Sequence, residues 1–152
     1  MRFIIQRVRE SSVSVDGKTV GAIGPGYCVL IGVSAYDTRK TADKMVQKML
    51  KLRIFQDENG KTNLSLSDVS GALLLISQFT LYADLRGQNR PGFVKAGNPE
   101  HADALYQYII ESCRAAGFPT ECGIFGADMK VSLVNDGPFT IILDSAELGF
   151  DS

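Results

Sequence analysis

The residues of this chain that could do chemistry stand at the ends of apolar segments. Residues 77–80, Ser-Gln-Phe-Thr, come directly after the apolar run 73–76, and residues 135–138, Asn-Asp-Gly-Pro, separate two strand-like segments. A strand buried on both faces should not end in so many hydrogen-bonding side chains unless a functional site needs them. A strand emerging into solvent and an ordinary turn are the alternatives, and composition alone leaves them open.

The Gly137–Pro138 bond is a candidate for a rigid recognition element. A peptide bond before proline takes the cis form at a cost of only about 0.5–1 kcal/mol. A cis bond at this position would direct two successive carbonyl groups the same way from a stiff base. Such carbonyls can recognise the shape of a backbone irrespective of its side chain.

Other catalytic arrangements are excluded by residue type. His101 is the only histidine, so a multi-histidine metal site is impossible, and its place early on a predicted helix favours a solvent-facing side chain. The three cysteines, Cys28, Cys113 and Cys122, form no C-x-x-C pair, and we expect them to be reduced, buried apolar side chains. No G-x-S-x-G sequence is present, and the glycines near residue 24 open no helix, so no dinucleotide site is indicated.

Composition and charge restrict the function classes further. Hydrophobic residues make up 45% and charged residues 22% of the 152 residues, which excludes a disordered, collagenous or disulfide-stapled chain. The net charge is -1, so a nucleic-acid partner must be held by a local basic patch. No apolar stretch approaches the roughly 20 residues that span a membrane, and we expect a cytoplasmic protein.

Hydropathy patterning marks nine strand-like segments, which we expect to form about eight strands, most of them in hairpin order. The Asp16-Gly17 pair is a strong signal for a tight hairpin. The predicted strands lie at residues 3–8, 11–15, 18–23, 27–33, 52–55, 73–79, 121–124, 130–134 and 139–143.

Two amphipathic helices complete the predicted elements. The first follows a cap at Asp37 or Thr38, and the second is capped by Asn98, continues with Pro99 and ends at Gly117. These elements predict the α+β class: an antiparallel or mixed sheet, curled toward a barrel, with both helices packed on it. We expect a single domain over residues 1–152.

The chain resembles the D-aminoacyl-tRNA deacylase family over nearly its whole length. The likeness is specific because two motifs, Ser-Gln-Phe-Thr at 77–80 and Asn-x-Gly-Pro-x-Thr at 135–140, occur together and in this order. Further matching segments lie at residues 5–8, 52–55, 63–65, 81–84 and 125–129. Phe139 departs from the family pattern, and so does the stretch at 86–93, which has fewer basic residues than the family often has and lacks a serine before Phe93. Neither departure changes a signature residue of the two motifs.

The resemblance implies a homodimer with its active site at the dimer interface and with neither a metal nor an organic cofactor. The implied reaction is hydrolysis of the ester that joins a D-amino acid to the 3′-terminal adenosine of tRNA. Glycine mischarged on tRNA(Ala) is an implied second substrate. The implied biological role is proofreading that keeps D-residues out of ribosomal synthesis.

The resemblance also assigns roles to particular residues. It implies that the catalytic pocket is lined by Ser77, Gln78, Phe79 and Thr80. The pair Gly137 and Pro138 is implied to be cis and to reach into the pocket of the partner subunit. There its carbonyls would clash with an L-amino acid and leave room for a D-amino acid or glycine, and exclusion of this kind separates enantiomers better than attraction does.

Supporting roles follow from the same resemblance. Arg7 is implied to hold the orientation of the Gly-Pro motif that Asn135 begins, and Met129 to lie near the terminal adenine. The best candidates for contacts to tRNA phosphates are three cations of the loop at 84–97, Arg86, Arg90 and Lys95. A solvated charged loop is the alternative for these three.

Two questions of mechanism stay open at this point. The motif at 77–80 contains no base to activate the Thr80 hydroxyl as a nucleophile, and the resemblance favours participation of the ribose 2′-hydroxyl of the tRNA. The rival functions are a non-catalytic RNA-binding module and a cofactor-free esterase for small substrates. The two intact motifs argue against the first rival, and the lack of a nucleophile–base set argues against the second.

Overall fold

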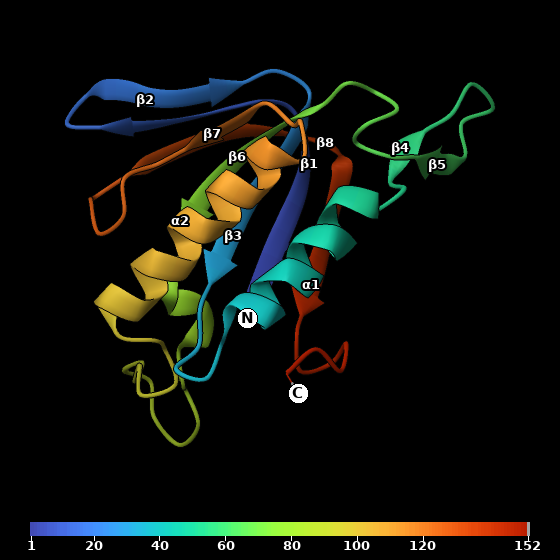
Figure 1. The fold of residues 1–152 in the computed structure, drawn as a ribbon. Helices are drawn as coiled ribbons and strands as arrows, with labels where there is room; N and C mark the ends of the chain where they lie inside the picture. Colours follow the sequence, from blue (N-terminus) through green and yellow to red (C-terminus); the bar gives the residue numbers. More distant parts are fainter. Residues whose placement is uncertain (152) are drawn as a thin grey trace.

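Eight strands build one curled six-stranded sheet and a separate two-stranded ribbon in the computed structural model, which describes residues 1–151 (Figure 1). The strands are β1 (Arg2–Val15), β2 (Lys18–Ile23), β3 (Gly26–Gly32), β4 (Phe55–Gln56), β5 (Thr62–Leu64), β6 (Ala72–Ser77), β7 (Thr120–Cys122) and β8 (Lys130–Asp144). The helices are α1 (Arg39–Lys51), α2 (Pro99–Ala115) and a short 3-10 helix, η1 (Phe79–Tyr82).

The sheet is mixed and almost closes on itself. Its strand order is β2-β1-β3-β6-β7, with β8 paired to the remaining side of β1. β1 is antiparallel to β2, β3 and β8, whereas β3–β6 and β6–β7 are parallel pairs. Gly21 of β2 lies so close to β7 that a Cβ atom there would be 2.9 Å from the carbonyl oxygen of Cys122. The predicted α+β class, with a mixed sheet curled toward a barrel, is therefore confirmed.

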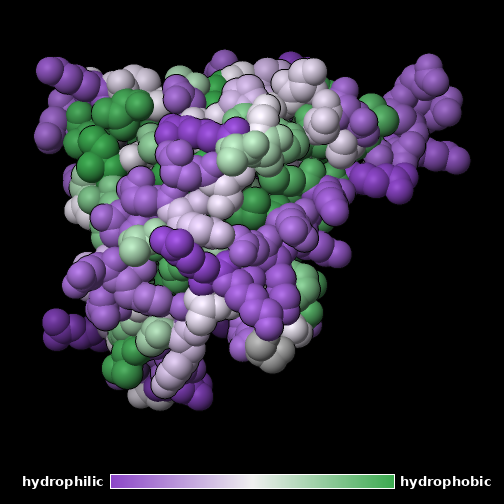
Figure 2. All heavy atoms as spheres, viewed as in Figure 1, coloured by the Kyte–Doolittle hydropathy of each residue, from purple (hydrophilic) through white to green (hydrophobic). Residues whose placement is uncertain are grey.

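Two apolar clusters hold the elements together. The larger cluster lies between the sheet and the two helices, which cover the same face of the sheet in Figure 1. Met45 of α1 and Ile109 of α2 are buried in this cluster. The smaller fills the inside of the curl and includes Val13, Leu74 and Ile76. Figure 2 shows that the outward faces of the helices are mainly hydrophilic.

Both helices begin at predicted caps. The Thr38 hydroxyl accepts from the N–H of Thr41, and the Asn98 side chain accepts from the N–H of His101 at 2.9 Å, with Pro99 in the first turn. Asp37, the other candidate cap, instead accepts a hydrogen bond at 2.9 Å from the buried N-terminal ammonium of Met1. None of the helices among residues 1–151 is both long enough and apolar enough to cross a membrane.

Several predicted strands have different bounds in the structure, and those predicted at 3–8 and 11–15 form the single strand β1. The strand predicted at 52–55 is wrong, because Leu52 caps α1 and pairing begins only at Phe55. β6 ends at Ser77 rather than residue 79, since Gln78 donates to the carbonyl of Ile31 and the chain then turns into η1. The strands predicted at 130–134 and 139–143 form one strand, β8, whose pairing with β1 is interrupted by a bulge.

The three thiols are expected to differ in reactivity. Burial raises the pKa of Cys28, and it raises the pKa of the Cys113 thiol to about 12, so the reactive thiolate is scarce at both. Cys122 is only partly buried. Titration of the folded protein with a chromogenic disulfide should therefore detect one thiol, and titration after unfolding should detect three. Fast reaction of all three in the folded protein would contradict the buried positions of Cys28 and Cys113.

Candidate active site

A pocket of about 630 Å³ opens where the carboxyl end of β6 meets the N-terminus of α2. Most of its wall comes from three segments: the end of β6 with η1, the chain from Phe93 into the first turn of α2, and the chain that leads into β8. The lining residues are Val33, Ile76, Ser77, Gln78, Phe79, Phe93, Ala96, Gly97, Asn98, Pro99, Ala102, Phe125, Gly126, Ala127, Asp128, Met129 and Val131. Four of the predicted site residues are therefore brought together here: Ser77, Gln78, Phe79 and Met129.

The position of the Ser-Gln-Phe-Thr motif follows from the burial of β6. Leu74 and Leu75 are fully buried and β6 lies between two parallel neighbours, so the strand can present polar groups only where it ends. The chain then turns abruptly into η1. The backbone N–H groups of Phe79 and Thr80, in the first turn of η1, make no hydrogen bond to residues 1–151. Two unused donors thus stand next to the pocket.

The Thr80 hydroxyl has no base beside it. Its side chain is exposed, does not line the pocket and accepts a hydrogen bond from the side-chain amide of Gln78. An amide cannot remove a proton from a hydroxyl at neutral pH. The geometry thus offers Thr80 no activation as a nucleophile within the described chain.

Two aromatic rings form one edge of the pocket. Phe79 is 54% exposed although it is large and apolar. The ring of Phe93 packs edge-on against it, with 4.8 Å between the centroids. Such an edge suits a planar, partly apolar group. Sequence reasoning missed Phe93 and Phe125 as lining residues; the signal for Phe93 was a large apolar residue inside an otherwise polar, basic loop.

Met129 is seated over Gly123. A Cβ atom at Gly123 would lie 2.4 Å from the Met129 sulfur, so Gly123→Ala must displace this side chain, which lines the pocket. Because methionine is flexible, the free energy of unfolding should fall by less than about 1 kcal/mol, while KM for the pocket's substrate should rise about fivefold. Steady-state kinetics and chemical denaturation check this, with Met129→Leu as a volume-matched control. An unchanged KM would show that Met129 does not contact the substrate.

The second predicted motif forms a braced bulge in β8. The Gly137–Pro138 bond is cis, and both residues are exposed. The Asn135 side chain stabilises the bulge with two hydrogen bonds. Its oxygen accepts from the N–H of Phe139 at 2.7 Å, and its amide nitrogen donates to the side-chain oxygen of Gln6 at 2.9 Å.

Arg7 also fixes the backbone of this bulge. Its guanidinium donates to the carbonyls of Asp136 at 2.9 Å and Ile54 at 2.6 Å, and it lies over the Phe139 ring at 4.5 Å. Arg7 is only 6% exposed. A buried, doubly bonded guanidinium fixes the backbone that it contacts, so the bulge is a rigid element.

The bulge and the pocket of one chain do not meet. Val131 lines the pocket and Gly137 lies on the same strand, six residues farther on. At the rise of an extended strand this separates them by roughly 20 Å. Within one chain, Gly137 and Pro138 therefore cannot touch a ligand bound in the pocket.

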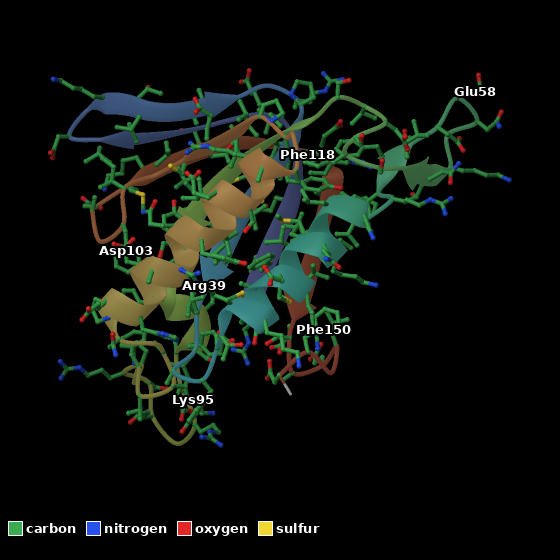
Figure 3. All side chains as sticks on the ribbon, viewed as in Figure 1. Arg39, Glu58, Lys95, Asp103, Phe118 and Phe150 are labelled. Carbon is green, nitrogen blue, oxygen red and sulfur yellow. The ribbon has the colours of Figure 1, made fainter. Side chains whose placement is uncertain are left out.

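The three cations of the basic loop do not line the pocket, although Phe93, Ala96 and Gly97 of the same loop do. Arg86 is engaged by Asp84 through two side-chain hydrogen bonds, and this pairing holds the pKa of the Asp84 carboxyl well below its usual range. Arg90 and Lys95 are exposed, and Figure 3 shows Lys95 at the loop beyond the N-terminus of α2. Among residues 1–151, no group of three or more His, Cys, Asp or Glu side chains is placed to hold a metal ion.

Sequence comparison places the chain among known proteins. The profile of the D-Tyr-tRNA(Tyr) deacylase family matches residues 4–144. The D-aminoacyl-tRNA deacylase of Paracoccus denitrificans is 53% identical over 147 residues, which cover 97% of this chain and 99% of that protein. The D-aminoacyl-tRNA deacylase of Chlorobaculum tepidum is 55% identical over 146 residues, covering 95% and 97% respectively.

Solved structures share the architecture. The structure of a c-Myc DNA Unwinding Element Binding Protein superposes with a TM-score of 0.90 at 44% identity, covering 95% of this chain and 99% of that one. The structure of a probable eukaryotic D-amino acid tRNA deacylase superposes with a TM-score of 0.82 at 19% identity, covering 93% and 97%. The second likeness concerns the fold alone.

Proposed function

Because the chain belongs to the D-Tyr-tRNA(Tyr) deacylase family and is a hydrolase of D-aminoacyl-tRNA, we propose how its residues carry out that reaction. The observation that carries the proposal is the pocket at the end of β6, where Ser77, Gln78 and Phe79 form one wall. The ester at the 3′ end of the tRNA lies against this wall. In this proposal the single domain expected over residues 1–152 serves this one activity, and a tRNA substrate favours a cytoplasmic location.

The protein contributes position and electrostatic stabilisation to the hydrolysis. The free N–H groups of Phe79 and Thr80 donate to the oxyanion that forms on the ester carbonyl. The ribose 2′-hydroxyl of the tRNA takes part in place of a protein nucleophile, since Thr80 has only the Gln78 amide beside it. Met129 and the Phe79–Phe93 edge hold the terminal adenosine.

The choice of enantiomer comes from a second subunit. The bulge at Gly137 and Pro138 is exposed, rigid and too distant to reach the pocket of its own chain, which favours insertion into the pocket of a partner. Among residues 1–151, no strand pairs with the edge of β8 opposite β1, and Val134 and Ile142 of β8 are 45% and 64% exposed. Exposed apolar side chains along a free strand fit a homodimer contact.

Inside the partner's pocket the two carbonyls face the α-carbon of the bound amino acid. An L-side chain collides with them, whereas a D-side chain points away and glycine has none. Glycyl-tRNA, including glycine mischarged on tRNA(Ala), is therefore a second substrate. A steric clash of about 1–3 kcal/mol gives discrimination of up to about 100-fold.

The decisive experiment compares D- and L-tyrosyl-tRNA, radiolabelled in the amino acid, with glycyl-tRNA as a third substrate. We expect release of D-tyrosine and glycine, and release of L-tyrosine about 100-fold more slowly. Equal rates for the two enantiomers would contradict the carbonyl gate. Binding without hydrolysis would indicate an RNA-binding module, and hydrolysis of simple D-tyrosine esters at the same efficiency would indicate a small-substrate esterase.

A further inference from the structure

A row of lysines runs along the outer face of α1. Lys40, Lys44, Lys48 and Lys51 follow one another at intervals of four, four and three residues. At 3.6 residues per turn these positions fall on one side of the helix, away from the face that buries Met45. The four lysines, called here the α1 lysine row, span roughly 16 Å of helix axis.

The α1 lysine row has no internal charge partner. No carboxylate of residues 1–151 lies within 4.0 Å of any of its ammonium groups. The only acidic residue of the helix, Asp43, accepts the phenolic hydrogen of Tyr108 at 2.6 Å. Lys44 lies over the ring of Phe150 at 5.8 Å, and the other three lysines are exposed.

This arrangement is unfavourable for an isolated helix. Like charges three or four residues apart destabilise a helix by about 0.2–0.5 kcal/mol per pair. The first turn carries Arg39 and Lys40 and no acidic residue, although the helix dipole favours anions at that end. A cation row that weakens its own helix implies an anion outside the chain.

The charge of the molecule is also divided unevenly. α1 carries five cations and one anion, a net charge of +4, while the whole chain carries -1, so the remainder carries -5. Figure 2 shows a continuous hydrophilic band over α1, and in Figure 3 the labelled Arg39 lies at the start of this helix, toward α2. In the basic loop, Arg86 is already paired with Asp84. Among the described elements, α1 is therefore the strongest cationic surface without acidic partners.

The start of α1 is connected to the pocket wall. The N–H of Ala35 donates to the carbonyl of Lys95 at 3.2 Å, and Ser34 forms a β-bridge with Ala96, which lines the pocket. The α1 lysine row therefore begins near the segment that holds the reacting end of the substrate and leads away from it.

We propose that the α1 lysine row binds the phosphate backbone of the tRNA outside its 3′ end, an inference that rests on the proposed function. Flexible ammonium groups suit phosphates, which need a point charge and no fixed orientation. A phosphate backbone supplies evenly repeated anions along the length of the row. The contact is independent of base identity and of the amino acid.

The test uses the double variant Lys48→Gln/Lys51→Gln, because both side chains are exposed and glutamine keeps helix propensity. Kinetics are compared on D-tyrosyl-tRNA and on the D-tyrosyl ester of the trinucleotide CCA, which has the reacting end without the RNA body. We expect KM for the tRNA to rise about tenfold and the slope of log affinity against log salt to become shallower by about 1.5. The trinucleotide ester should be hydrolysed as by the unmodified protein.

Two controls accompany it. Lys48→Arg/Lys51→Arg keeps the charges and should keep the affinity, and Lys18→Gln, at the distant β1–β2 turn, should change the salt slope less than Lys48→Gln alone. An unchanged tRNA affinity, as expected if the row serves an acidic protein partner, or an equal loss on both substrates, would overturn the proposal. Failure of the unmodified protein on both substrates would instead overturn the proposed function.

Discussion

A D-tyrosyl-tRNA whose terminal adenosine lacks the ribose 2′-hydroxyl is expected to be hydrolysed about a thousandfold more slowly than the ordinary substrate. A reacting group held beside the ester on the same molecule has an effective concentration far above that of any solute, so its removal is costly. Thr80 cannot replace it, because its hydroxyl accepts a hydrogen bond from the Gln78 amide, which is not a base. Single-turnover rates at saturating enzyme separate this loss from weaker binding.

The matched protein variant is Thr80→Ala. Thr80 is exposed and does not line the pocket, so we expect the variant to retain activity within about fivefold. Normal turnover of the 2′-deoxy substrate, together with loss of activity in Thr80→Ala, would reverse the assignment and make Thr80 the nucleophile. His101→Ala should likewise retain activity, since the His101 side chain has no hydrogen-bond partner among residues 1–151 and does not line the pocket. Its Nε2 is buried, so the predicted solvent-facing position is wrong for this atom.

Asp37→Ala is expected to lower the free energy of unfolding by about 3–5 kcal/mol, the usual cost of leaving a buried charge unpaired. The Asp37 carboxylate accepts from the Met1 ammonium at 2.9 Å and from the N–H of Ser34 at 2.6 Å, and the ammonium is fully buried. Urea denaturation measures the loss. Because Ser34 is bridged to Ala96 in the pocket wall, activity at a temperature where the variant is folded should also fall.

Asp43→Ala is the matched control. Asp43 lies six residues farther along the chain, and its carboxylate is exposed and bonded to a surface tyrosine. We expect it to cost less than about 1 kcal/mol. A loss of the same size in both variants would contradict the special role given to the buried ion pair.

Local signals in the sequence were sufficient for the turns and helix ends. The Asp16-Gly17 hairpin is confirmed by the pairing of Val15 with Lys18. The caps at Thr38 and Asn98 are confirmed as well, because a cap depends on side chains within a few residues. Asp37 fits a cap equally well by type, and only the fold reveals that the N-terminus lies against it.

The parts that sequence reasoning missed depend on contacts between distant segments. Hydrophobic periodicity does not distinguish a parallel from an antiparallel neighbour, so the parallel pairs of β6 were not predictable individually. The wall at Ala96 and Gly97 consists of small residues with no chemical signal of their own. The two motifs were found because their residue types are unusual at strand ends. The structure places three of the four residues of the first motif in the pocket wall, and the second motif lies about 20 Å away along β8.

The length of β8 acquires a meaning from this separation. Val131 at its start belongs to the pocket, and Gly137 in its middle belongs to the bulge, with extended chain between them. If each bulge enters the other subunit, the length of this stretch determines the distance between the two active sites of the dimer. Substitutions along the stretch leave its length unchanged. Adding or deleting one residue displaces both active sites and turns every later side chain to the opposite face.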